Sequence, residues 1–381
     1  MCSQMKTVKI LSFVFFLAFG AVQVQAQRIV IPDLKEYKTL QCDFHIHTVF
    51  SDGTVWPTVR IDEAYREGLD AISITEHIYP VTSRRVYLQE IESQSNLSLK
   101  GISHNISYKL AKSLAKERNI ILIRGSEITC NTSPWHSNAI FLDNSDELDK
   151  PEWMDSFRAA KAQNAFFFWN HPGREKDQPD TTLWWPEHTR LLQEGMMQGI
   201  EVVNGGSQGY SADAHRWALE KKLTFLGNSD IHAPMPPFAP GQHRVMTLVF
   251  AKERTAEAIH EALRERRTAI YYEDFIIGEE TYLKQLFEST LEWKIDKTDD
   301  GVLVTVRNKS DLTFRLKKTG SDARLVYFRN TAIIPFTIVP NSERSFTVRL
   351  NDGITGGDIN FSVENFMVEP NKGMRYSVKI N

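Results

Sequence analysis

The chain has 381 residues, 41% of them hydrophobic, and its 45 basic and 48 acidic side chains leave a formal net charge of -3. This length suits a barrel of roughly 250 residues with a smaller companion domain. Because no block of basic residues occurs, the composition argues against binding to long nucleic acids or to an anionic membrane surface.

Residues 1–26 have the features of a cleavable secretory signal. Lys6 and Lys9 precede an apolar stretch from residue 10 to 22, and Val24-Gln25-Ala26 stand ahead of Gln27. The stretch is short for a spanning helix, so we expect an exported protein, periplasmic or secreted, without a stable membrane anchor. Cys42 and Cys130 would remain after cleavage, and two buried thiols are favoured over a disulfide between them.

From residue 39 to about 270, short apolar runs alternate with amphipathic ones, which predicts strand–helix units around a mainly parallel barrel. Helices are predicted at residues 57–67, around 106–114 and at 255–266. The polar stretch 84–101 is predicted to form a loop or lid over the site. The predicted strands are residues 40–45, 71–75, 120–123, 138–142, 165–169, 200–203, 224–227 and 246–250.

After about residue 285, apolar residues alternate with a period of two, as at Val302, Val304 and Val306. This pattern predicts an all-β domain, a small sandwich. The segment has no histidine, so a packing or binding role is expected for it. The predicted division is a signal peptide at 1–26, a barrel domain at 27–280 and a β-sandwich-like domain at 281–381.

Histidines and carboxylates stand at the ends of the predicted strands. His45 and His47 would project from one face of an extended backbone, and Asp230 and His232 repeat this spacing. In a barrel such strand ends meet at one rim, where ligands converge. Imidazoles and carboxylates without cysteine suit Zn, Mn or Fe, and the number of ligands predicts two or three divalent ions. The segments between the two pairs add His77, Glu127, His136 and His171.

Taken in order, these motifs resemble the polymerase and histidinol phosphatase (PHP) family of metal-dependent phosphoesterases. The resemblance implies an α/β fold, a distorted (β/α)7 TIM-like barrel with a C-terminal all-β domain similar to that of an organophosphate-diesterase subgroup. The matching motifs are Asp43-Phe44-His45-Ile46-His47-Thr48 with Ser51-Asp52-Gly53, Ile74-Thr75-Glu76-His77, Gly125-Ser126-Glu127-Ile128, Asn170-His171-Pro172-Gly173 and Asn228-Ser229-Asp230-Ile231-His232.

The resemblance also implies three groups of metal ligands. They are His45, His47, Glu127 and Asp230 for one ion, Glu127, His136 and His171 for a second, and Asp52, His77 and His232 for a third. Two of these positions have an alternative interpretation. The Ser-Asp-Gly stretch around Asp52 also suits an ordinary turn, and His136 also suits a hydrogen-bonded structural histidine.

The expected mechanism uses two cations that share Glu127 and activate a metal-bridged hydroxide to attack phosphorus. Arg174 either binds a substrate phosphate or is a solvated loop arginine paired with Glu175 or Asp177. Asp230 or His232 would protonate the leaving alkoxide. His232 is preferred, because a metal-bound carboxylate is a poor acid.

We therefore predict a metal-dependent phosphoesterase for small phosphate esters, with diesters favoured. Alternatives are a phosphomonoesterase of histidinol-phosphatase type, a nuclease for short oligonucleotides and a noncatalytic metal-binding protein. Trp184 and Trp185 stand in a loop-like context and are expected to face the substrate, whereas residues 166–169 are expected in the barrel core. The histidines assigned to surface or structure are His104, His188, His215, His243 and His260.

Overall fold

The computed structural model describes residues 28–79, 101–179, 181–239, 241–299, 301–320, 325–329, 336–350 and 357–380. The expected signal peptide lies outside these ranges, and so does the expected lid except for its last residue, Gly101. Within them, no helix combines the length and apolar character needed to cross a membrane.

The N-terminal part of the chain alternates strands and helices. Its elements are β1 (Lys38–Ile46), α1 (Pro57–Arg66), β2 (Ala71–Ile74), β3 (His77–Ile78), α3 (Ile106–Glu117), β4 (Ile121–Thr129), β5 (His136–Ile140), η1 (Ser145–Leu148), α4 (Trp153–Ala162), β6 (Phe166–Trp169), α5 (Pro186–Gln193), β7 (Gly199–Asn204), β8 (Gly209–Tyr210), α6 (Ala212–Glu220), β9 (Thr224–Asn228), β10 (Met246–Ala251), α7 (Ala256–Arg264), β11 (Thr268–Tyr272) and β12 (Phe275–Gly278).

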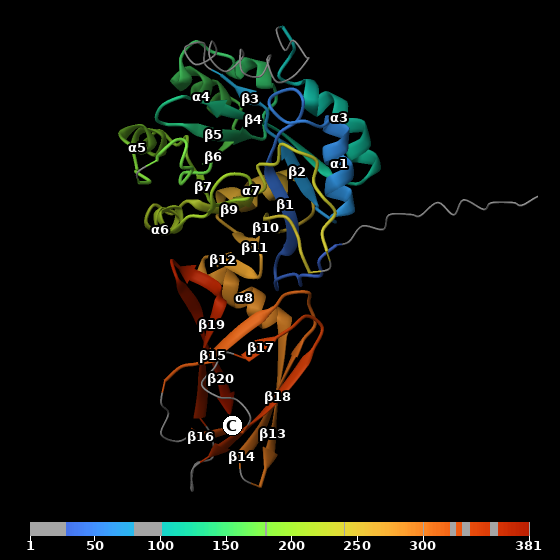
Figure 1. Ribbon diagram of the computed structural model, residues 1–381, viewed down its shortest axis with the longest axis vertical. Helices are drawn as coiled ribbons and strands as arrows, with labels where there is room; N and C mark the ends of the chain where they lie inside the picture. Colours follow the sequence, from blue (N-terminus) through green and yellow to red (C-terminus); the bar gives the residue numbers. More distant parts are fainter. Residues whose placement is uncertain are drawn as a thin grey trace, which may run out of the picture.

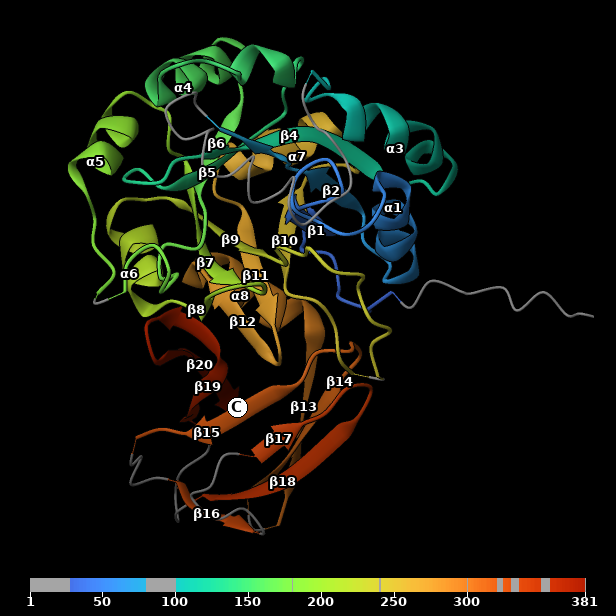
Figure 2. The ribbon, with the colours of Figure 1, turned by 45° about the horizontal axis from the view of Figure 1, so that its top comes forward.

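A curved sheet in the order β10-β1-β2-β4-β5-β6-β7, with β9 beside β7, forms the barrel. The sheet closes because the chain after β9 returns to the end of β1. The backbone N–H of Asp230 donates to the carbonyl of His45 at 2.9 Å, and that of His47 donates to the carbonyl of Ile231 at 3.2 Å. Helices α1, α3, α4, α5 and α6 lie around the outside of the curved sheet (Figure 2).

Strand direction follows the expected parallel arrangement except at β5 and β10. The pairs β1–β2, β2–β4, β6–β7 and β7–β9 are parallel. Strand β5 runs antiparallel to both of its neighbours, and β10 runs antiparallel to β1. The connection from Thr129 to His136 is too short for the crossover that a parallel pair needs. His136, the first residue of β5, therefore lies at the rim where the parallel strands end.

Both faces of the barrel sheet are buried, as the continuous apolar runs predicted. On β6, Phe166 and Phe168 belong to a cluster with Phe44 and Leu226 of β1 and β9. Alternate residues of the same strand, Phe167 and Trp169, pack on the other face together with side chains of α4, α5 and α6. The expected core position of residues 166–169 is observed.

The C-terminal part is all-β apart from the helix that leads into it. Strands β13, β14, β18 and β16 form one sheet, and β12 of the barrel pairs in parallel with β19, so the second sheet continues that of the barrel. Strands β13, β14, β16 and β18 lie at the opposite end of the molecule from β3 and β4 (Figure 1). The elements are α8 (Glu280–Thr290), β13 (Leu291–Thr298), β14 (Gly301–Asn308), β15 (Phe314–Lys318), β16 (Leu325–Arg329), β17 (Phe336–Ile338), β18 (Glu343–Leu350), β19 (Gly357–Glu369) and β20 (Lys372–Ile380).

Candidate metal centre

All nine side chains proposed as metal ligands converge at one rim of the barrel. Their nitrogen and oxygen atoms form overlapping groups in which every atom lies within 4.8 Å of the others. The groups are His45–His47–Glu127, His45–His171–Asp230, His77–Glu127–His136 and His47–Asp52–His77–His232. Side chains from β1, β3, β4, β5 and the segments after β6 and β9 therefore share one centre.

The group implied for the first ion, His45, His47, Glu127 and Asp230, surrounds the buried ends of the two imidazoles. Their Nε2 atoms are 3.0 Å apart, and they lie 3.2 and 3.3 Å from Oδ1 of Asp230. Glu127 Oε2 lies 3.5 Å from the His45 nitrogen and 3.3 Å from that of His47. Asp230 has a left-handed backbone, with φ of 50°, directly after β9. A side chain at Gly206 would approach the carbonyl of Asp230 to 2.7 Å, so glycine there leaves room for this turn.

The group implied for the second ion, Glu127, His136 and His171, gathers on the other oxygen of Glu127. His136 Nδ1 lies 2.9 Å from Oε1, and His171 Nε2 lies 3.6 Å from it. Glu127 thus faces imidazoles on both of its oxygens, which is the geometry expected of a carboxylate that bridges two ions. His136 Nδ1 is within hydrogen-bond distance of Glu127, so its position is compatible both with a ligand and with a hydrogen-bonded structural histidine.

The group implied for the third ion, Asp52, His77 and His232, lies at the more open side of the centre. Asp52 contacts Nε2 of His77 at 3.2 Å and Nε2 of His232 at 3.1 Å, and Nδ1 of His47 lies 3.6 Å from it. Asp52 also belongs to a turn, in which the N–H groups of Ser51 and Gly53 donate to the carbonyl of Thr48 at 3.1 and 3.0 Å. The two interpretations of Asp52 are compatible, because the turn aims the carboxylate at the histidines.

The donor set fits divalent cations. Glu127 Oε2 is buried and accepts no hydrogen bond from the part of the chain that the structure describes, although three imidazoles approach it. Buried carboxylate oxygens ordinarily find hydrogen-bond donors, so this atom is suited to a metal. Nitrogen and oxygen donors in this combination suit Zn, Mn or Fe.

The pKa of each histidine in the cluster depends on the charges of its neighbours. Burial disfavours the protonated form of His45, but Asp230, Glu201 and Glu127 raise its pKa well above the usual value. His171 behaves in the same way, because the neighbouring carboxylates of Asp177 and Glu127 outweigh burial and raise its pKa to about 9. Burial and the neighbouring His232 and His77 lower the pKa of His47 to about 4.

The carboxylates of the centre stay ionised. Burial opposes this, but His77, His45 and His136 hold the pKa of Glu127 well below its ordinary range. Asp230 is likewise buried and Asp52 is partly exposed, and the surrounding histidines hold the pKa of each carboxylate below its ordinary range. The site therefore presents several negative charges to an incoming cation.

Glu201 on β7 is an important residue that the sequence analysis missed. It is fully buried, and its Oε1 lies 2.9 Å from His45 Nδ1, so it orients the ring that presents Nε2 to the centre. Its Oε2 accepts from the backbone N–H of His171 at 2.8 Å. Asn204 and Asn228 donate to the two oxygens, at 2.8 and 2.9 Å. A glutamate inside the buried run Gly199–Asn204 was the available signal.

Glu76 organises the loop that carries Asp52. The hydroxyls of Thr48 and Ser51 both donate to its carboxylate, and Ser107 on α3 donates to it at 2.6 Å. Ser51 Oγ in turn lies 3.2 Å from His47 Nδ1. Glu76 thus holds the turn and, through Ser51, the ring of His47. In the sequence, Glu76 belongs to a matching motif, but no role was predicted for it.

Arg174 lies close to the centre but is not free of partners. Its Nη1 is 3.6 Å from Oδ2 of Asp177, and the same carboxylate oxygen is 3.6 Å from Nδ1 of His171. The side chain of Arg174 is 22% exposed. Both interpretations of Arg174 therefore have a basis, since it pairs with Asp177 and also stands beside a proposed ligand.

The expected substrate-facing role of Trp184 does not match its packing. Its ring packs edge to face against Trp169 and Trp217, with centroids 5.9 and 5.5 Å apart, and it belongs to the surroundings of the barrel core. Trp185 precedes α5 and donates from Nε1 to Gln178 at 2.9 Å. The apolar character of Trp184 is thus explained by its contact with other tryptophans.

The other histidines and the cysteines have structural surroundings. His188 is buried and stacks on Trp169 with ring centroids 3.7 Å apart. His215, His243 and His260 also lie against aromatic rings, and His104 lies 3.8 Å from Asp149. The preferred interpretation of the cysteines agrees with the structure, in which both thiols are buried and unpaired with each other.

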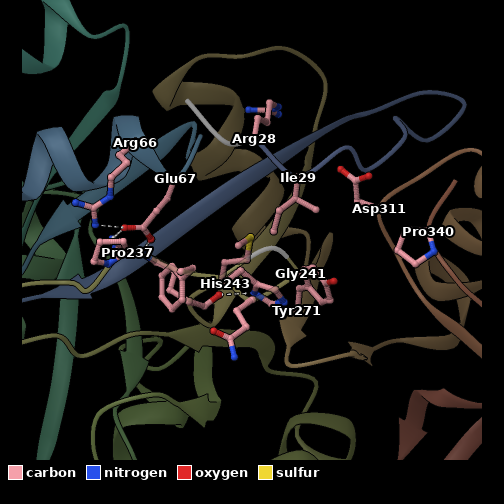
Figure 3. Close-up of a pocket in the computed structure, with 14 residues that line it drawn as sticks. Arg28, Ile29, Arg66, Glu67, Pro237, Gly241, His243, Tyr271, Asp311 and Pro340 are labelled. Carbon is pink, nitrogen blue, oxygen red and sulfur yellow. Dashed lines mark hydrogen bonds and ion pairs between the residues drawn. The ribbon is translucent and has the colours of Figure 1, made fainter. Parts of the chain in front are cut away.

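A separate cavity of about 450 Å³ lies between the barrel and the C-terminal domain (Figure 3). It is bounded by the N-terminal segment, the end of α1, the β9–β10 connection, β11 and, from the C-terminal domain, Asp311 and Pro340. None of the nine cluster residues lines it. Its arginines are already paired, with Arg28 at 2.9 Å from Asp70 and Arg66 at 3.1 Å from Glu67.

The wall of this cavity is connected to the metal centre through buried charges. Arg244 lines the cavity and pairs with Glu67 at 2.6 Å and with Asp43 at 3.0 Å. Asp43 accepts from the backbone N–H of Ser229 at 3.1 Å and from its hydroxyl at 2.5 Å. This network supports the backbone on which Asp230 stands.

Comparison with known proteins identifies relatives of both parts. A family model of an Ig-like domain matches residues 288–379. A crystal structure from Bacteroides vulgatus, of a two-domain protein containing a predicted PHP-like metal-dependent phosphoesterase, is 47% identical to this chain. The match covers 93% of this chain and 99% of that one, with a TM-score of 0.84.

Two further solved structures are more distant. One from Bifidobacterium adolescentis, proposed to be a metal-dependent phosphoesterase, has 16% identity and a TM-score of 0.40 over 60% of this chain and 97% of that one. An amidohydrolase from Chromobacterium violaceum has 17% identity and a TM-score of 0.33 over 51% of this chain and 88% of that one. No curated protein matches the chain.

Proposed function

This chain belongs to the PHP-like metal-dependent phosphoesterases, and on that premise we propose that it hydrolyses small phosphodiesters at a centre of two or three divalent cations. The observation that carries the proposal is the convergence of nine imidazole and carboxylate side chains on one rim. Zinc, manganese or iron is the proposed metal, and residues 1–26 are proposed to direct export to the periplasm or beyond the cell.

Bound cations would supply Lewis-acid stabilisation of the phosphoryl oxygens and a nucleophile from water near neutral pH. The protein's own groups would hold and orient these ions. Glu127 would contact two of them, since each of its oxygens faces a different set of imidazoles. Glu201 would keep the His45 ring in the tautomer that leaves Nε2 unprotonated.

The preference for diesters is supported by the charges around the rim. A monoester carries about two negative charges near neutral pH and a diester carries one. In the described ranges, the arginine beside the centre, Arg174, already shares Asp177, and Arg60 is saturated by protein groups. The balance favours a substrate with a single negative charge.

His232 is proposed to protonate the leaving alkoxide when the third group holds no ion. Its side chain is 37% exposed, whereas Asp230 is buried among histidines that keep it ionised. Its Nδ1 lies 2.9 Å from the backbone carbonyl of Asp230, so Nε2 is the atom available to substrate. A nitrogen bound to a cation cannot donate a proton, so the two roles of His232 exclude each other.

The test compares bis(p-nitrophenyl) phosphate with p-nitrophenyl phosphate after the mature protein is loaded with Mn or Zn. We expect faster turnover of the diester, with activity abolished by chelation and in His45→Ala or Asp230→Ala. His104→Ala removes a histidine outside the cluster and should retain activity. A metal-loaded protein that cleaved neither compound would refute hydrolysis of these esters, and a faster monoester reaction would replace the diesterase proposal with a phosphomonoesterase.

A further inference from the structure

Arg60 on α1 is buried and makes a set of bonds that the proposed catalysis does not explain. Its guanidinium carries five N–H groups, and five hydrogen bonds use its three nitrogens. Nε donates to the carbonyl of His47 at 2.9 Å, and one Nη1 bond goes to Glu63 at 2.8 Å. The remaining Nη1 bond and both Nη2 bonds go to backbone carbonyls of the segment after β9.

That segment carries His232. Nη2 donates to the carbonyls of Ile231 and His232 at 3.1 and 2.9 Å, and Nη1 donates to that of Ala233 at 2.9 Å. One planar group therefore ties three consecutive carbonyls after β9 to the carbonyl of His47 at the end of β1. The rings of His47 and His232 stack with centroids 4.4 Å apart and an interplanar angle of 19°.

We propose that Arg60 is a positioning residue that sets the spacing of His47 and His232 and thereby makes the group His47–Asp52–His77–His232 a true third metal site. Lysine has one ammonium group with three donors and cannot reproduce the flat, five-donor arrangement. The inference rests on the metal centre of the proposed function, and with the third ion bound His232 is a ligand and not the proton donor proposed for the centre with two ions. It goes further because it assigns the affinity of one particular site to a residue that contacts no ligand atom.

The test measures metal binding without substrate. Metal-free protein is titrated with Zn in competition with a chelator, the bound metal is counted, and thermal unfolding is recorded for the wild type, Arg60→Lys and Glu63→Gln. We expect three ions in the wild type and, in Arg60→Lys, at least about tenfold weaker binding of the weakest ion with the others changed less than threefold. Glu63→Gln should lower thermal stability but keep the third ion, since the four carbonyl bonds remain.

Each result decides the matter. Equal weakening of all ions in Arg60→Lys, or a loss of the third ion in Glu63→Gln as well, would reduce Arg60 to a general support of the fold and overturn the inference. A wild type with two ions would also overturn it, while leaving the phosphoesterase intact. A wild type that bound no metal would instead refute the proposed function itself.

Discussion

Replacing Glu201 by glutamine tests how the barrel prepares its first metal site. The carboxylate accepts four hydrogen bonds, two on each oxygen, from His45 and Asn228 and from His171 N and Asn204. A glutamine amide has one accepting oxygen and one NH2 group. Whichever way the amide turns, its NH2 group must face two donors.

The consequences can be derived for each orientation. If the NH2 group faces His171 N and Asn204, a buried backbone donor loses its acceptor, which costs about 1–3 kcal/mol of unfolding free energy. If it faces His45, the ring can accept the bond only by moving its proton to Nε2, the nitrogen that must bind the metal. Loss of such an outer partner lowers metal affinity by about 10–100-fold.

The assay is a chelator competition for Zn together with thermal unfolding of the metal-free protein. We expect Glu201→Gln to lose metal affinity, stability or both by these amounts. Glu117→Gln changes a glutamate whose side chain is 70% exposed and should match the wild type in both measurements. If Glu201→Gln also matched the wild type, the orienting role of this carboxylate would be wrong.

Three further predictions concern charge. Arg174→Gln should raise KM for a diester about tenfold with little change in kcat if the guanidinium binds phosphate, and an unchanged KM in steady-state kinetics would leave Asp177 as its only partner. The pKa of His171 is raised to about 9, so this ring is protonated at pH 7 in the metal-free protein, and metal binding should release protons and strengthen with pH. Calorimetry in two buffers of different ionisation enthalpy checks this, and identical heats would contradict it. Burial lowers the pKa of His188 to about 4, so its contribution to stability is complete above pH 6.5 and is lost as pH falls toward 4, by roughly 2 kcal/mol at pH 5. Chemical denaturation at pH 5 and 7.5 should give a smaller difference for His188→Gln than for the wild type, and an equal difference would exclude this histidine as a source of acid sensitivity.

The metal cluster could be predicted from sequence because its residues stand at strand ends, and several are paired at a spacing of two residues that is recognisable in the sequence. His45 and His47, like Asp230 and His232, alternate on an extended backbone, and closure of the barrel then brings both pairs together. The strand positions were predictable for the same reason, since β6 and its neighbours are apolar on both faces.

The supporting residues were hidden because their partners are far away in the chain. Glu201 contacts His45 across 156 positions, and Arg60 contacts Ile231 across 171. No local spacing encodes such pairs. The antiparallel direction of β5 was missed because a short apolar run has no intrinsic direction, and Trp184 was misjudged because a loop residue can still pack inward on Trp169.

The most direct test of the account is to locate cations by anomalous scattering in crystals of the metal-loaded protein. The account predicts peaks between His45, Glu127 and Asp230, between Glu127 and His171, and, if Arg60 acts as proposed, beside Asp52. Ions bound elsewhere, with ordinary solvent among these side chains, would contradict it.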